Sequence, residues 1–302
     1  MISREALAEL LRYLKIAHYR FVAVTPATHA RVVSRPAPRT LGLRDIFGWN
    51  RVFDQGDVSE AVIALLQAAG ALESQEGKLR SKVRVASLGE ELLLHSSYPT
   101  DEADAVFFGP DTYRFARFIE QQLPRLGKTQ WLVDMGSGSG AGAIAAARLR
   151  KFAKVTMIDT NAAALDLARI NAAAASVDAE MILSDTIPGG ADLIIANPPY
   201  MIDAAGRSYR DGGDLFGGQV ALDWARQALE QLQPGGAMLL YTGAAFVDGQ
   251  APLIAELERM CAETGSTVDI AEIDPDVFGE ELDQPHYTPV ERIAAIGAVL
   301  RT

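Results

Sequence analysis

The feature that most constrains the fold is a glycine-rich turn between a short apolar run and an alanine-rich stretch. The pattern predicts a buried strand over residues 131–134, a tight turn over 136–140 and a helix over 142–150. Glycine tolerates left-handed backbone angles and lets a ligand approach the main chain closely. A strand, such a turn and a helix in this order predict a pocket for a nucleotide-like ligand at the end of an α/β sheet.

Strands and helices continue to alternate to the end of the chain. Further strands are predicted at 155–158, 181–183, 191–195, 237–241, 268–273 and 293–300, and further helices at 113–122, 162–175, 215–232 and 252–262. Alternation at this spacing indicates an α/β fold with a mostly parallel, doubly wound sheet. We expect the last two strands to form an antiparallel hairpin at one edge, and Asp111 or Thr112 to cap the helix over 113–122.

The first hundred residues follow another pattern. It predicts helices over 3–20, within 41–53 and over 57–69, a loop over 25–40, and a hairpin that pairs 78–85 with 92–94. Helices followed by a hairpin resemble a small winged-helix unit. The helix over 57–69 has acids and no Lys or Arg, which favours protein docking over DNA readout. We therefore expect an N-terminal α+β docking domain, residues 1–104, and a second domain, residues 105–302.

Charge and cysteine content narrow the possible partners and compartment. The 302 residues carry a net charge of −11, but residues 1–51 hold nine Lys or Arg against three Asp or Glu, which leaves −17 for the remainder. The acidic remainder argues against broad phosphate-backbone binding, while the basic leading segment leaves a nucleic-acid partner open. A single cysteine, Cys261, and the lack of a long apolar run predict a cytoplasmic protein with no membrane contact.

Acidic residues follow the predicted strand ends, where ligands bind in open α/β sheets. Asp134 precedes the glycines, Asp159 lies 23 residues after Gly136, and Asp185 ends the next strand. An acid at the Asp159 position can accept both hydroxyls of a ribose. Three acids suit a cofactor with a sulfonium and an ammonium better than a pyrophosphate. This favours S-adenosylmethionine over a nicotinamide dinucleotide, although the glycine spacing also satisfies the dinucleotide pattern.

The strand over 191–195 runs directly into Asn197-Pro198-Pro199-Tyr200. Each proline fixes its own φ and keeps the preceding residue extended, so Asn197 is held at the carboxyl end of the strand. The Asn197 side-chain oxygen and the Pro198 carbonyl can both accept hydrogen bonds, and Tyr200 offers a flat aromatic face. Two acceptors beside a stacking face suit a planar group that bears an NH2, such as an amide or a nucleobase.

Together these residues resemble class I S-adenosylmethionine-dependent methyltransferases with an Asn-Pro-Pro-Tyr motif, and within them the release-factor glutamine methyltransferase group. The resemblance covers about residues 107–300 and includes Pro110-Asp111-Thr112 and an Asp-Gly-Gly loop within 209–218. It implies a Rossmann-like fold, with Asp159 on the ribose and Asp185 by the adenine. The implied cofactor-binding residues are Asp134, Gly136, Ser137, Gly138, Ser139, Gly140, Asp159, Asp185 and Asn197, and the implied catalytic residues are Asn197, Pro198, Pro199 and Tyr200. No metal is implied.

Two departures from that group leave the substrate open. Tyr241 stands where the group has an acid, and the first hundred residues do not resemble its helical N-terminal domain. We expect methylation of a planar nitrogen, with a protein glutamine as the first choice. The alternatives are an exocyclic amine of adenine or guanine in RNA or DNA, a small-molecule amine, a winged-helix regulator that only senses the cofactor, and an NAD-dependent reductase.

Overall fold

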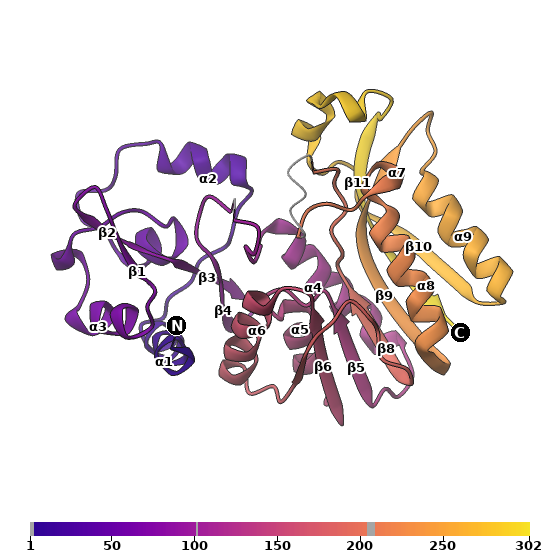
Figure 1. Ribbon diagram of the computed structural model, residues 1–302, viewed down its shortest axis with the longest axis horizontal. Helices are drawn as coiled ribbons and strands as arrows, with labels where there is room; N and C mark the ends of the chain where they lie inside the picture. Colours follow the sequence, from indigo (N-terminus) through magenta and orange to yellow (C-terminus); the bar gives the residue numbers. More distant parts are fainter. Residues whose placement is uncertain (1–2, 101, 204–208) are drawn as a thin grey trace.

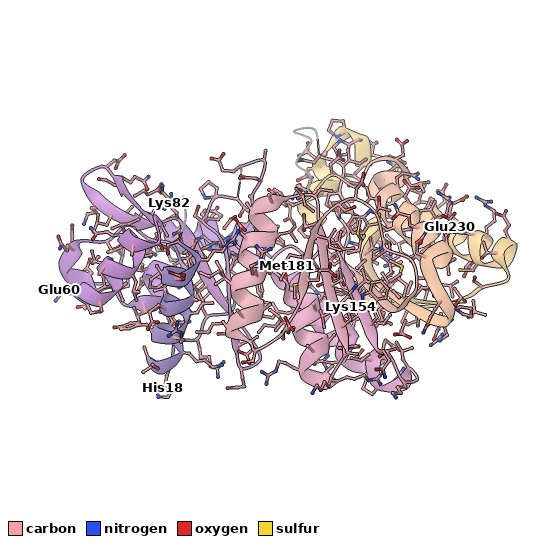
Figure 2. All side chains as sticks on the ribbon, turned by 60° about the horizontal axis from the view of Figure 1, so that its bottom comes forward. His18, Glu60, Lys82, Lys154, Met181 and Glu230 are labelled. Atoms are coloured by element: carbon pink, nitrogen blue, oxygen red, sulfur yellow. The ribbon has the colours of Figure 1, made fainter. Side chains whose placement is uncertain are left out.

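The computed structural model describes residues 3–100, 102–203 and 209–302. A helical region with two hairpins lies beside a large mixed sheet, and the N-terminus and C-terminus lie in these two different parts (Figure 1). Glu60 on the first part and Glu230 on the second lie toward opposite ends of the long axis (Figure 2).

The sheet has seven strands in the order β10-β11-β9-β8-β5-β6-β7. They are β5 (Trp131–Met135), β6 (Lys154–Asp159), β7 (Glu180–Leu183), β8 (Ala191–Ala196), β9 (Leu232–Phe246), β10 (Thr267–Asp274) and β11 (Arg292–Arg301). Strand β11 pairs antiparallel with both β9 and β10, and the other neighbouring pairs are parallel. The predicted α/β fold, with a mostly parallel sheet and an antiparallel last strand, is confirmed.

Helices cover both faces of this sheet. They are α4 (Pro110–Gln122), α5 (Ala141–Leu149), α6 (Ala162–Ala174), α7 (Asp214–Gly217), α8 (Gln219–Gln231) and α9 (Pro252–Thr264), with short turns η3 (Leu123–Arg125), η4 (Gly279–Asp283) and η5 (Pro285–Tyr287). Leu193 and Ile195 of β8 belong to the core beneath α4, α5 and α6, whereas Ile194 belongs to the core beneath α8 and α9. Neighbouring side chains of a strand point to opposite faces, so a strand buried on both faces is apolar throughout.

The N-terminal region is built from helices and two hairpins. Its elements are α1 (Arg4–Ile16), α2 (Pro26–Val33), η1 (Arg44–Gly48), η2 (Gln55–Asp57), α3 (Glu60–Ala68), β1 (Leu72–Gln75), β2 (Lys78–Ser81), β3 (Val83–Leu88) and β4 (Glu91–Ser96). Ser3 caps α1 as predicted, by accepting a hydrogen bond from the backbone N–H of Ala6. Within the described residues, none of the helices combines the length and apolarity needed to cross a membrane.

Three local predictions were wrong. The loop expected over 25–40 contains α2, because the Thr25 hydroxyl accepts from the N–H of Thr28 and Pro26 suits the first helical turn. The strand expected over 78–85 is split, since Lys78–Ser81 pairs with Leu72–Gln75 and only the residues from Val83 onward pair with β4. The fourth helix begins at Pro110, so Asp111 lies inside its first turn instead of capping it.

Helix α6 connects the N-terminal region to the sheet. Its buried Asn171 side chain accepts a hydrogen bond from the N–H of Leu94 at 2.8 Å and donates one to the Leu94 carbonyl at 3.0 Å. An ion pair between Glu91 of β4 and Arg148 of α5 lies at the same boundary. The Asn171 side chain therefore pairs with backbone groups at the open edge of β4. These hydrogen bonds hold the N-terminal region against the sheet region.

Candidate functional site

A cavity of about 320 Å³ lies at the carboxyl ends of β5, β6 and β8. Its walls come from the glycine-rich turn, residues 159–161, residues 197–201 and the start of α4. Pro26, the first residue of α2, also lines it, so the N-terminal region forms part of the wall. The volume is in the range of small-molecule sites, and the position is the one expected for ligands in this fold class.

The glycine-rich turn has a backbone that other residues rarely adopt. Gly136 has φ +67° and Gly138 has φ +52°. A Cβ on Gly136 would lie 2.5 Å from Cη2 of Trp224, whereas a Cβ on Gly138 would meet nothing within 4 Å. Both glycines line the cavity, with Ser137 and Ser139 beside them. The Ser137 hydroxyl is buried and has no hydrogen-bond partner within the described residues, so the turn offers a polar atom to a ligand.

Two predicted acids line the same wall. Asp159 at the end of β6 accepts from the N–H of Gly138 at 2.8 Å and from the N–H of Asn161 at 2.9 Å, while burial raises its pKa. Asp134 accepts from the N–H of Ala143 at 2.8 Å. Burial raises the pKa of Asp134 to about 7, against the lowering effect of that hydrogen bond. A cationic ligand at this wall would stabilise both carboxylates.

Two other predicted cofactor residues lie elsewhere. Among the described residues that line the cavity, neither Gly140 nor Asp185 is present. Gly140 precedes α5 at φ +80°, and a Cβ there would lie 3.2 Å from Sδ of Met157. Asp185 is exposed and accepts from the Thr186 hydroxyl at 3.0 Å. Ser184, one residue earlier, lines the cavity in its place.

The Asn-Pro-Pro-Tyr segment forms another part of the cavity wall. Asn197, Pro198, Pro199 and Tyr200 all line the cavity, directly after β8. Within the described part of the chain, the Asn197 side chain has no hydrogen-bond partner, and its exposure is intermediate. The amide of Asn197 is therefore available to a ligand.

A buried network that the sequence analysis did not predict lies beneath Tyr200. The Tyr200 hydroxyl donates to Oδ2 of Asp111 at 2.6 Å, and the Tyr241 hydroxyl donates to Oδ1 at 2.8 Å. Arg114 donates to Oδ1 of Asp111 at 3.1 Å and pairs with Asp274 at 2.8 Å. Asp111 lies 89 and 130 residues from the two tyrosines in the chain, so no local pattern identifies the group.

Aromatic rings surround the rest of the cavity. Phe107 and Tyr209 both line it, with ring centroids 6.4 Å apart and planes 7° from parallel. Trp224 and Phe278 line it from α8 and from the segment before η4. These rings, with Tyr200, give the site several flat apolar surfaces beside a few polar atoms, as expected for a planar ligand.

Residues 114–246 match the family model described as the methyltransferase small domain. The chain is similar to a release factor glutamine methyltransferase of Deinococcus radiodurans, with 33% identity over 195 residues, which cover 60% of this chain and 66% of the relative. It is also similar to a ribosomal RNA large subunit methyltransferase G of Vibrio vulnificus, with 35% identity over 102 residues, 32% of this chain and 27% of the relative. A crystal structure of Trm5b from Pyrococcus abyssi shares the fold, with a TM-score of 0.51 and 17% identity over 81% of this chain and 68% of that chain. The matched part of the chain thus spans less than two thirds of either curated relative.

Proposed function

We propose that the protein transfers a methyl group from S-adenosylmethionine to a planar nitrogen, because residues 114–246 match the family model of the methyltransferase small domain. One observation carries this proposal: Asn197, whose amide has no hydrogen-bond partner among the described residues, and Pro198 line one cavity with the glycine-rich turn. S-adenosylmethionine, when bound, supplies an electrophilic methyl group on its sulfonium. The cavity is therefore a place where an acceptor nitrogen can be held beside the cofactor.

The residues present fit this cofactor. The Ser137 hydroxyl, which has no partner among the described residues, and the open face of Gly138 can receive the amino-acid part, and Asp134 can balance its positive charge. Asp159 retains unused lone pairs for the ribose hydroxyls. Ser184, which lines the cavity, replaces Asp185 in our assignment of the adenine side.

The nitrogen of an amide or aryl amine is a weak nucleophile because its lone pair is delocalised. The Asn197 side-chain oxygen and the Pro198 carbonyl accept its two hydrogens, which aims the lone pair at the methyl group and favours the pyramidal transition state. The nitrogen forms the new bond to the methyl carbon as the carbon–sulfur bond breaks, the sulfur keeps that electron pair, and the extra proton leaves the nitrogen afterwards. Burial raises the pKa of the Tyr200 and Tyr241 hydroxyls, so neither acts as the base.

A protein glutamine side chain is the first candidate acceptor. It presents the planar NH2 that the two acceptors require, and several relatives are named release factor glutamine methyltransferase. Tyr200 and the other aromatic rings of the cavity would cover the faces of the amide.

An exocyclic amine of a nucleobase is the second candidate, favoured by an arginine-rich surface on and after α2. Arg31, Arg35, Arg39 and Arg44 are exposed, and among the described residues they have no carboxylate partner. The surface begins near the cavity, since Pro26 of the same helix lines it. Arginine binds phosphates bidentately, although the acidic remainder of the chain opposes a long polyanion.

A labelling experiment separates these possibilities. The protein and radiolabelled S-adenosylmethionine are added to a cell extract, which is then divided into protein, nucleic-acid and small-molecule fractions. Label in a protein band that yields methylated glutamine supports the first candidate, and label in RNA or DNA supports the second. Tight cofactor binding with no transfer to any fraction would contradict the proposed activity and favour a sensor.

A further inference from the structure

We propose that Asp111 is a positioning residue of the acceptor pocket, whose carboxylate fixes the Tyr200 ring in the orientation that the methyl acceptor requires. This inference rests on the proposed function and concerns the same site. Asp111 was expected to cap a helix, but the structure places its carboxylate beneath the acceptor segment.

The carboxylate accepts hydrogen bonds from three side chains. Oδ2 accepts from Tyr200, which follows β8, and Oδ1 accepts from Tyr241 of β9 and from Arg114 of α4. The Tyr200 bond is 2.6 Å long, in the range of charge-assisted O–H···O⁻ bonds, which are about twice as strong as neutral ones. Asp111 is 4% exposed and Tyr241 is fully buried, so water cannot replace either bond easily.

The Tyr200 ring is also fixed on its other sides. A Cβ on Gly243 would lie 2.2 Å from Cδ2 of Tyr200, so the ring packs directly against the backbone of β9. Phe278 meets it edge-on, with ring centroids 5.9 Å apart. Contact with β9 and Phe278 limits translation of the ring, and the bond to Asp111 prevents its hydroxyl from turning out of the core.

Burial keeps the two tyrosine hydroxyls of this network protonated. Arg114 lies between the carboxylates of Asp111 and Asp274 and pairs with both. Burial and the neighbouring Asp111 raise the pKa of both tyrosines, so their hydroxyls remain protonated donors. The tyrosine ring, rather than a tyrosinate, is therefore the group that Tyr200 presents to the cavity.

The position of Asp111 gives this bond a role beyond packing. Asp111 is the second residue of α4, and the segment from Ala105 to Thr112 contributes to the cavity wall together with the glycine-rich turn. The bond from Tyr200 therefore joins the wall next to the predicted cofactor to the segment predicted to hold the acceptor. Tyr241, which stands where the resembling group has an acid, donates to an acid supplied by α4 instead.

Asp111 itself lines the cavity, so a direct contact with cofactor or acceptor is the competing explanation. A double-mutant cycle distinguishes the two. We compare Asp111→Asn, Tyr200→Phe and the double variant in methyl transfer to the acceptor fraction identified by labelling, with kcat, KM and the cofactor Kd measured separately.

If Asp111 acts through Tyr200, each single variant lowers kcat/KM for the acceptor by about tenfold or more. The double variant is then no worse than the poorer single variant, and the cofactor Kd stays within about threefold of wild type. Losses that multiply in the double variant, or a cofactor Kd that weakens in parallel with kcat/KM, would overturn the proposal.

Glu272→Gln is the matched control, because it neutralises another arginine-paired carboxylate of β10 whose partner, Arg292, lies outside the Asp111 network. We expect near wild-type kcat/KM from it, and an effect equal to that of Asp111→Asn would also overturn the proposal. If wild type transfers no methyl group, the proposed function fails first. Thermal midpoints of the same variants then test the contact alone, and additive decreases would refute it.

Discussion

The side-chain amide of Asn171 donates a hydrogen bond to the carbonyl oxygen of Ser139 at 2.9 Å. The same side chain pairs with both backbone groups of Leu94 in β4. One buried residue of α6 therefore connects the N-terminal region to the glycine-rich turn. We therefore expect docking of that region and the shape of the predicted cofactor site to be coupled through this side chain.

We expect Asn171→Leu to weaken both features. The change leaves the Leu94 N–H and two carbonyls without their partner, at a cost of about 1–3 kcal/mol per buried group in the free energy of unfolding. Binding of S-adenosylmethionine, measured by calorimetry, should weaken several-fold because the Ser139 carbonyl in the glycine-rich turn loses its hydrogen bond from Asn171. Arg169→Ala on the exposed face of the same helix is the control, and equal effects from both variants would contradict the coupling.

Gly138→Ala should abolish tight cofactor binding while the protein stays folded. Its φ is +52° and no atom lies within 4 Å of the new Cβ, so the expected cost is backbone strain of about 1–2 kcal/mol. The new methyl group would fill space offered to the ligand. Gly77→Ala, at φ +81° with similarly open surroundings in the turn between β1 and β2, introduces the same strain far from the cavity. Unchanged cofactor affinity in Gly138→Ala would show that the ligand does not lie against this turn.

Asn197→Ala should lose about 10²-fold or more in kcat, because one of the two acceptors for the target NH2 is removed. The cofactor Kd should remain within about threefold of wild type, because the glycine-rich turn is untouched. Single-turnover methyl transfer and calorimetry measure the two quantities independently. A parallel loss of cofactor affinity would remove Asn197 from the acceptor role.

Cofactor affinity should rise with pH between about 6 and 8. The pKa of Asp134 is raised to about 7 in the cofactor-free protein, so the carboxyl is largely protonated below that pH and ionised above it. Only the ionised form attracts the cationic cofactor, and one coupled proton changes Kd by at most about tenfold per pH unit. Asp134→Asn should bind the cofactor more weakly than wild type at pH 8, and its Kd should depend less on pH. If the Kd of wild type and of Asp134→Asn changed equally with pH, the positive charge of the cofactor would not lie near Asp134.

The buried His29 should make the N-terminal region sensitive to acid. Burial, with Arg84 nearby, lowers the pKa of His29 to about 4 from 6.5, so the folded state favours the neutral ring. Its contribution to the free energy of unfolding is on the order of 3 kcal/mol. This contribution is fully present above pH 6.5 and is lost as the pH falls toward 4.

Denaturant titrations at pH 7.5 and pH 4.5 test this dependence. His29→Gln should be less stable than wild type at pH 7.5, and the difference should shrink at pH 4.5. The control is His18→Gln, the same substitution at an exposed histidine. A constant difference between wild type and His29→Gln at both pH values would refute the role of His29.

Local patterns in the sequence were sufficient to predict most elements of the sheet region and the edge at which its site lies. Apolar runs alternate with helical patterns, so parallel strands and the carboxyl-end location of Gly136, Asp159 and Asn197 follow from chain order alone. The N-terminal region was harder to predict. Helix α2 depends on the Thr25 cap and on burial of His29, and the split of 78–85 depends on pairing with a second hairpin.

Only the tertiary structure determines which side chains hold the predicted site residues in place. Asp111 meets Tyr200 and Tyr241 because α4, β8 and β9 pack together, and Asn171 meets Leu94 and Ser139 because α6 lies between two regions. The same packing leaves Asp185 outside the cavity and places Ser184 in it. The spacing of apolar residues in one segment indicates which side of that segment faces the core. The contacts above depend on how distant segments pack on one another, and no local pattern of residues encodes that packing.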